Sequence, residues 1–88
     1  MTKEINYFSY NTKNGCIYAN DKHIVRWRFV RNSYSFFITV GRGVQYLNET
    51  DLEKLAKTAK WMTDKQGSNF GEPIEFLIRN YYKGEKVS

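Results

Sequence analysis

The chain holds few of the side chains from which metal sites and catalytic sites are usually built. Its 88 residues include one cysteine, Cys16, and one histidine, His23, which is too few for an internal disulfide or for a zinc site of the common ligands. A nucleophile pair of these two residues would have only Asp21 nearby to orient it. Glycine motifs that cradle phosphates or dinucleotides are absent as well. We therefore expect a protein that is not an enzyme and that holds neither a cofactor nor a metal.

Long apolar runs are missing too. No stretch approaches the roughly 18 consecutive apolar residues that span a bilayer, and the first residues, MTKEINYFSY, lack the apolar segment of a secretion signal. These absences predict a cytoplasmic protein without a membrane partner. Hydrophobic residues make up 41% of the chain and aromatic residues 17%, which suffices for one core but not for two at this length. We expect a single domain over residues 1–88, with frayed ends at 1–3 and 84–88.

Acidic residues are absent from the centre of the chain. The formal net charge is +5, and residues 23–43 contribute four arginines and no acid, a net of +4. Residues 44–88 hold seven basic and seven acidic side chains and are neutral. A clustered excess of one sign creates a local field that attracts polyanions, so the central segment is the expected contact with a nucleic acid. Its arginines are Arg26, Arg28, Arg31 and Arg42.

The first half of the chain has the composition of antiparallel strands. Four segments are rich in Ile, Val, Tyr and Phe, and turn residues such as Gly15 and Asn32 separate them. The segments are residues 4–10, 16–20, 23–31 and 34–40, and a short VQYL segment follows the GRG sequence at 41–43. We expect GRG to be a tight loop between strands.

Alternation sorts the side chains of the two central strands by face. The expected core side holds Val25, Trp27 and Phe29 of the first strand and Phe36, Ile38 and Val40 of the second. Arg26 and Arg28 then point outward, and Phe37 lies beside them.

A helix is expected after these strands. Thr50 and Glu53 form a T-x-x-E capping box that places its start near Asp51, Asn48 is a competing cap, and Gly67 suits its end. Apolar residues at three- and four-residue spacing form a stripe that can cover the sheet. They are Leu52, Leu55, Ala56, Ala59 and Met62. The opposite side holds Lys54, Lys57, Trp61 and Lys65.

Trp61 has two interpretations. We expect the second helix or the N-terminal strand to bury it, because exposed indoles are uncommon in a stable monomer. The alternative is a stacking platform or an interface residue that acts together with Lys65.

Residues 73–83 fit two kinds of element. Pro73 suits the first turn of a helix, with Gly84 as its stop, whereas EFLIRNYY also fits a final strand. The expected fold class is α+β: an antiparallel sheet of three to five strands, one well-capped helix packed on one face and a second, C-terminal helix. Over about residues 16–63 this layout is similar in topology to sheet-based nucleic-acid binders, including integrase arm-binding and plant AP2-type domains. None of the motifs of those families is present, so the similarity assigns no residue a role.

The arginines and the neighbouring rings predict a small nucleic-acid-binding accessory protein, with RNA or a single strand favoured. Guanidinium groups match phosphate oxygens and also stack on bases. The alternative without a binding function is a solvated sheet face whose cations protect an edge strand from aggregation. The expected contacts are Arg26, Arg28, Arg31 and Arg42 on phosphates, Phe37 and Tyr34 on bases, and Lys54 and Lys57 in addition.

A protein-binding function is the alternative of a different class. Interfaces are also enriched in Tyr, Trp and Arg. The same composition therefore suits a small inhibitor or adaptor, such as a phage-encoded factor that modulates a host enzyme or defence system, with nucleic acid as a co-partner. A homodimer through an exposed edge strand is compatible with both functions.

Overall fold

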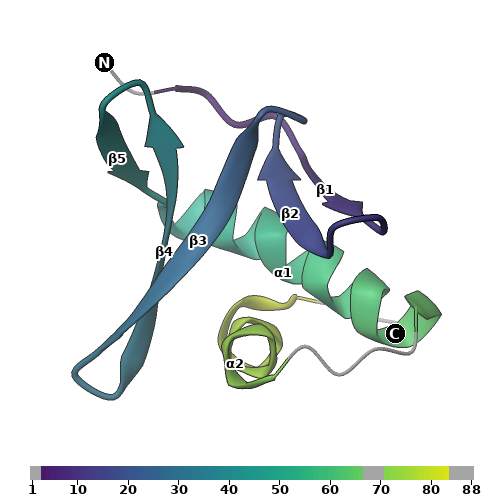
Figure 1. Cartoon of the computed structure of the whole chain (residues 1–88). Coiled ribbons are helices and arrows are strands. Elements are labelled where there is room, and N and C mark those ends of the chain that lie inside the picture. Colours follow the sequence, from purple (N-terminus) through teal and green to yellow (C-terminus); the bar gives the residue numbers. More distant parts are fainter. Residues whose placement is uncertain (1–2, 67–70, 84–88) are drawn as a thin grey trace.

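The computed structural model describes residues 3–66 and 71–83 and contains a five-stranded antiparallel sheet with two helices on one face (Figure 1). The strands follow one another across the sheet in chain order, so each connection is a hairpin. The elements are β1 (Phe8–Asn11), β2 (Cys16–Ala19), β3 (His23–Val30), β4 (Ser33–Val40), β5 (Gly43–Tyr46), α1 (Glu49–Gln66) and α2 (Glu72–Tyr81). The α+β prediction is confirmed, and the helical alternative holds for the C-terminal segment.

Several hairpin turns depend on backbone with positive φ. Gly15 (φ 73) and Gly41 (φ 59) occupy such positions before β2 and before β5, where a residue without Cβ is not strained. The turn between β3 and β4 instead uses Arg31 (φ 54) and Asn32 (φ 60), which is the type I′ geometry of a two-residue hairpin. An arginine is uncommon there, because its Cβ disfavours the left-handed conformation.

The core lies between the helices and the side of the sheet that faces them, which we name the inner face. Val25, Phe36 and Ile38 are buried there as expected, and Val40 is half-buried against them. Buried residues of α1 and α2 pack on this layer: Leu55, Ala56, Ala59, Met62, Ile74 and Leu77. The alternation of the central strands therefore predicted the inner face correctly near the middle of the sheet.

The prediction that Trp27 and Phe29 are also core residues is wrong. Both lie on the inner face, but they are 46% and 59% exposed. β3 and β4 have eight residues each, whereas β2 and β5 have four, so the end of the β3–β4 hairpin projects beyond α1 as a two-stranded ribbon (Figure 1). The two helices cover these rings only in part: Trp27 lines a cavity with Met62 of α1 and Ile74 of α2, and Phe29 contacts Tyr34, whose ring adjoins Phe76 of α2.

α1 begins two residues earlier than the capping box predicts. It starts at Glu49, and the side-chain Oδ1 of Asn48 accepts a hydrogen bond from the backbone N–H of Asp51 at 2.8 Å. Asn48 is therefore the N-cap, and Thr50 lies inside the first turn. With this cap, Glu49 and Asp51 lie in the first turn, where carboxylates stabilise the helix dipole.

α2 begins with Pro73 in its first turn and buries Ile74 and Leu77. The predicted helix stops at Gly67 and Gly84 lie outside the described residues. No helix in the described part of the chain is long and apolar enough to cross a membrane.

The N-terminal segment is attached to the sheet before β1 begins. The backbone N–H of Lys3 donates to Oε1 of Gln45 at 2.7 Å, and the carbonyl oxygen of Lys3 accepts from Nε2 of Gln45 at 2.8 Å. Ile5 is buried in the core. Lys3 thus has fixed partners although it belongs to the segment expected to fray.

Candidate nucleic-acid interface

A cation and two aromatic rings form one row across the side of the sheet that faces away from the helices, which we name the outer face. Arg26 of β3 pairs with Phe37 of β4, and Phe37 pairs with Tyr46 of β5. The two ring centroids are 5.6 Å apart, and the ring planes are inclined by 55°. Arg26 is exposed, Tyr46 is 53% exposed and Phe37 is half-buried. The row offers a positive charge and an open aromatic surface to the same ligand.

The other arginines extend this row along the sheet. Arg28 lies on the same face two residues from Arg26, which is about 7 Å along a strand, and pairs with Ser35. Arg31 and Arg42 are exposed in the turns at opposite ends of β4, whose eight residues span about 26 Å. The four arginines therefore do not form one cluster. They occur in the order Arg42, Arg26, Arg28, Arg31 along the length of β4.

The arginines are not neutralised by ion pairs within the described residues. The two ion pairs of that part of the chain, at 3.2 and 3.1 Å, use lysines instead of arginines. They join Lys60 to Asp64 and Lys83 to Glu53. The positive charge of the outer face is consequently available to a ligand.

Asp21, in the turn between β2 and β3, is held by two hydroxyl groups. Its carboxylate accepts hydrogen bonds from the Ser9 Oγ, at 2.6 Å, and from the Tyr7 phenol. These bonds, first that of Ser9 and then that of Tyr7, hold the pKa of Asp21 below its ordinary value. The same contact raises the pKa of Tyr7 above its ordinary value. The carboxylate is thus fixed within the turn by two neutral donors.

Tyr34 does not lie with the arginines of the outer face. It is half-buried on the inner face, with its ring centroid 5.5 Å from that of Phe76 on α2 and 4.9 Å from that of Phe29. Residues two apart in a strand share a face, so Tyr34 lies on the same face of β4 as the core residue Phe36. Tyr46 takes the place beside Phe37 instead. Sequence reasoning missed Tyr46, and the register of β5 against β4 is the signal that identifies it.

The lysines of α1 belong to a different surface. Lys54 donates from Nζ to the carbonyl oxygen of Ile5 at 3.1 Å and so fastens the N-terminal segment to the helix. Lys57, Trp61 and Lys65 are exposed on α1, which covers the opposite face of the sheet from the arginines. The expected burial of Trp61 is wrong, since the indole is 45% exposed. α2 packs on another side of α1 and leaves it open.

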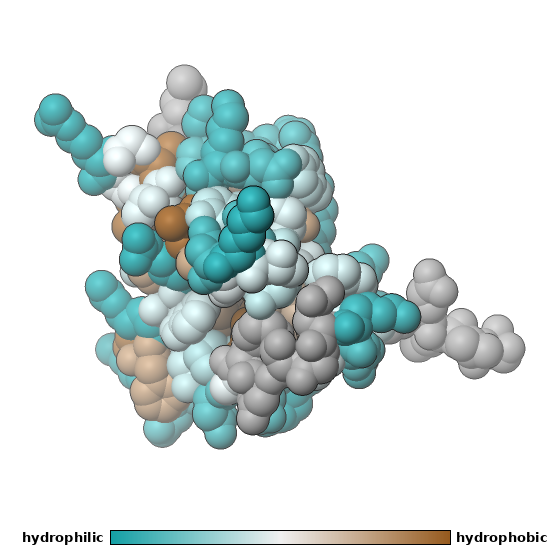
Figure 2. Space-filling view, turned by 45° about the vertical axis from the view of Figure 1, so that its right-hand side comes forward, coloured by the Kyte–Doolittle hydropathy of each residue, from teal (hydrophilic) through white to brown (hydrophobic). Residues whose placement is uncertain are grey.

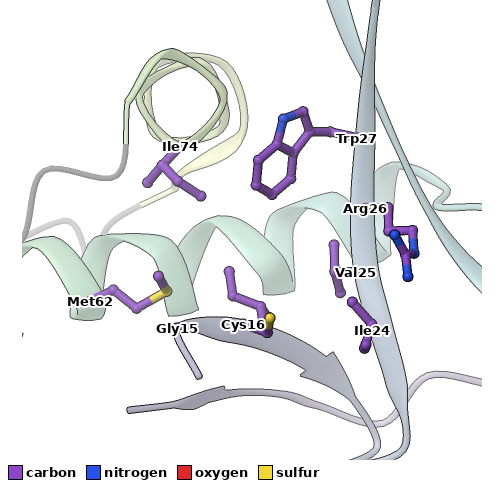
Figure 3. Close-up of a pocket in the computed structure, with 9 residues that line it drawn as sticks. Gly15, Cys16, Ile24, Val25, Arg26, Trp27, Met62 and Ile74 are labelled. Carbon is purple, nitrogen blue, oxygen red and sulfur yellow. The ribbon is translucent and has the colours of Figure 1, made fainter. Parts of the chain in front are cut away.

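A cavity of about 340 Å³ lies where β2 and β3 diverge. Its lining includes Ile17 of β2, Val25 of β3, Met62 of α1 and Ile74 of α2. The indole of Trp27 points into the space between β3 and α2, toward Ile74 (Figure 3).

On the side of the molecule seen in Figure 2, hydrophobic surface forms separate brown areas framed by hydrophilic residues. The sequence did not predict the cavity between β2 and β3, because its existence depends on how many residues of the two strands pair.

Across residues 3–66 and 71–83, no group of three or more His, Cys, Asp and Glu side chains is arranged to hold a metal ion. Comparison with known proteins adds no relative. No protein-family model matches the chain, and neither a curated protein nor a solved structure matches it significantly.

Proposed function

We propose that this protein binds nucleic acid, preferentially a single strand, on the outer face of its sheet. Arg26 and Arg28 pair with phosphates, and Phe37 and Tyr46 stack on bases. The observation that carries the proposal is the row of Arg26, Phe37 and Tyr46, in which an exposed cation that has no acidic partner among the described residues adjoins two neighbouring rings. Proteins that bind single strands combine a positive track along the backbone with rings on which bases stack.

The order of the arginines supports a strand that runs along β4. Such a strand would meet Arg42 first, then the row with the rings, then Arg28 and finally Arg31. A duplex hides the faces of its bases in the stack, so the rings favour a ligand with unstacked bases. Because every base has a face that can stack on a ring, we propose little sequence preference.

The experiment is a titration of labelled single- and double-stranded RNA and DNA oligomers at several salt concentrations, followed by fluorescence anisotropy. For single strands the logarithm of affinity falls with the logarithm of salt by about 0.7 per phosphate contact. Contacts from all four arginines predict a slope near −2.8, whereas contacts from Arg26 and Arg28 alone predict a slope near −1.4. The slope thus counts the arginines that bind.

The test variant is Arg26→Glu with Arg28→Glu, and the matched control is Lys57→Glu with Lys65→Glu. Both variants lower the net charge by four, since each of two substitutions exchanges +1 for −1. We expect the arginine variant to lose about tenfold or more in affinity and the helix variant to lose much less, because the field of an exposed charge is screened within about 8 to 10 Å. Equal losses in the two variants, or a salt slope near zero in the native protein, would overturn the proposal.

A further inference from the structure

The edge of β3 that faces β2 is paired over two residues only. Tyr18 pairs with Ile24 and Ala19 with His23, and β2 then diverges from β3 (Figure 1). In the part of the chain that the structure describes, no strand pairs with residues 25–30 on this side. We name these six residues the free edge of β3; they represent about 20 Å of strand.

The backbone of Trp27 and Phe29 is directed toward this free edge. The two-residue turn joins Val30 to Ser33, and such turns close with a hydrogen bond between the flanking residues. In an antiparallel ladder every second residue bonds to the same neighbour, so Arg28 also bonds to β4. The intervening residues therefore turn their N–H and C=O groups away from β4, and a row of unpaired groups is a template for another strand.

The cavity described above opens at the start of the free edge. Ile17 and Val25 line it from the two diverging strands, and Met62 and Ile74 line it from the helices (Figure 3). Proteins that bind an added strand obtain affinity from backbone hydrogen bonds and specificity from pockets for alternate side chains. This edge has both parts of such a site.

The two faces beside the free edge differ in chemistry. On the inner face, Trp27 and Phe29 present half-exposed rings. On the outer face, Arg26 and Arg28 are exposed, and among the described residues they have no acidic partner. Side chains of an added strand alternate between these faces. A complementary strand therefore alternates apolar residues, directed to the rings and the cavity, with acidic residues, directed to the arginines.

We propose that the free edge of β3 binds an extended segment of a partner protein in which apolar and acidic residues alternate. This site shares Arg26 and Arg28 with the proposed nucleic-acid site, but it depends in addition on the strand edge, the cavity and the inner-face rings, which nucleic-acid binding does not use. A second copy of this chain fits less well. Pairing of β3 with its own copy would place arginines beside arginines, and like charges opposite one another destabilise a ladder. A nucleic acid lacks the regular backbone donors and acceptors that complete a strand pair.

The experiment is amide hydrogen exchange of the full chain by NMR, with and without a synthetic peptide. The probe alternates valine and glutamate over about eight residues, a usual strand length. The amides of Trp27 and Phe29 should exchange at least about tenfold more slowly when the peptide is bound. The amide of Arg28 serves as the internal control, because it already bonds to β4 and should change little.

Two altered peptides test the backbone hydrogen bonds and the charge contacts separately. Methylation of the backbone nitrogens on the pairing edge should abolish protection, because it removes the ladder hydrogen bonds. Lysine in place of glutamate should abolish it through repulsion from Arg26 and Arg28. Protection by the lysine peptide, or none by the glutamate peptide at saturation, would overturn the proposal. Protection that rises with protein concentration alone would assign the edge to a second copy, and equal protection by a single-stranded oligonucleotide would assign it to nucleic acid.

Substitution of a ring distinguishes this proposal from the proposed function. Phe29→Thr keeps a strand-forming residue at an exposed position and should weaken peptide binding about fivefold or more. It should leave oligonucleotide affinity unchanged. The control is Val44→Thr, which alters a residue of similar exposure, 55%, on β5 and should not affect the peptide. Thermal melts verify that both variants fold. Unchanged peptide affinity in Phe29→Thr would refute the peptide site while leaving nucleic-acid binding intact.

Discussion

Folding and the proposed binding function make opposite demands on Arg31. It occupies the first central position of the β3–β4 turn at φ 54, where a side chain with Cβ is strained by about 1–2 kcal/mol. Arg31→Gly removes this strain but adds an entropy cost of about 0.5–1 kcal/mol, because glycine loses more backbone freedom on folding. The difference predicts that the free energy of unfolding rises by about 0.5–1 kcal/mol. For a domain of this size Tm then rises by roughly 2–8 °C.

The same substitution removes the cation at one end of the outer face. We expect weaker oligonucleotide binding and a salt slope that is less negative by about 0.7. Calorimetry measures the change in Tm, and anisotropy titration measures the change in oligonucleotide affinity and in its salt slope. Arg31→Asn is the matched control, because asparagine also tolerates the left-handed conformation without the charge, whereas Arg31→Lys keeps both the strain and the charge. A lower Tm for Arg31→Gly would refute the strained turn, and an unchanged slope would remove Arg31 from the contact.

Two further predictions concern local hydrogen bonds. Asn48→Ala should lower the free energy of unfolding by about 1 kcal/mol, because it removes the N-cap hydrogen bond. Thr50→Ala should change the free energy of unfolding little. Urea unfolding of both variants decides which residue caps α1. The hydrogen bonds from Ser9 and Tyr7 lower the pKa of Asp21 in the folded state. Their contribution to stability is therefore present above the ordinary carboxyl pKa of 3.8, and it is lost as the pH falls through the lowered pKa of the folded state. Asp21→Asn should remove this part of the dependence of Tm on pH, and an unaltered dependence between about pH 2 and pH 5 would contradict the assignment.

Strands, turns and the division of side chains between the two faces could be predicted. β-branched and aromatic content marked the strands, and Gly15 and Asn32 marked two of the turns. The period of two placed Arg26 and Arg28 on the face opposite Val25, as the structure has them. These features depend on neighbours within a few residues in the chain, so they can be derived without knowledge of the packing.

Exposure and proximity could not be derived in the same way. Trp27 lies on the same face as Val25, yet it is half-exposed, because β2 pairs with β3 over two residues only and leaves the indole beside an open cavity. Trp61 was expected to be covered and is open, because α2 docks on another side of α1. The exposure of Trp27 and Trp61 thus depends on where elements distant in sequence meet. Tyr46 joined the candidate site through the register between β4 and β5, which the two-residue turn at Gly41 and Arg42 sets, so it required the exact turn length and not only the presence of a turn.

The amino-acid sequence alone determined the α+β class, the hairpins, the apolar stripe of α1 and the concentration of positive charge in residues 23–43. Propensity, alternation and charge count are properties of short segments, so they can be taken from the sequence without the packing. The tertiary structure decided which stretch of an apolar face is covered, which rings adjoin Arg26, and where β2 leaves β3 to form the cavity and the free edge. Those results depend on relative strand lengths and helix docking, which are set when the whole core packs at once.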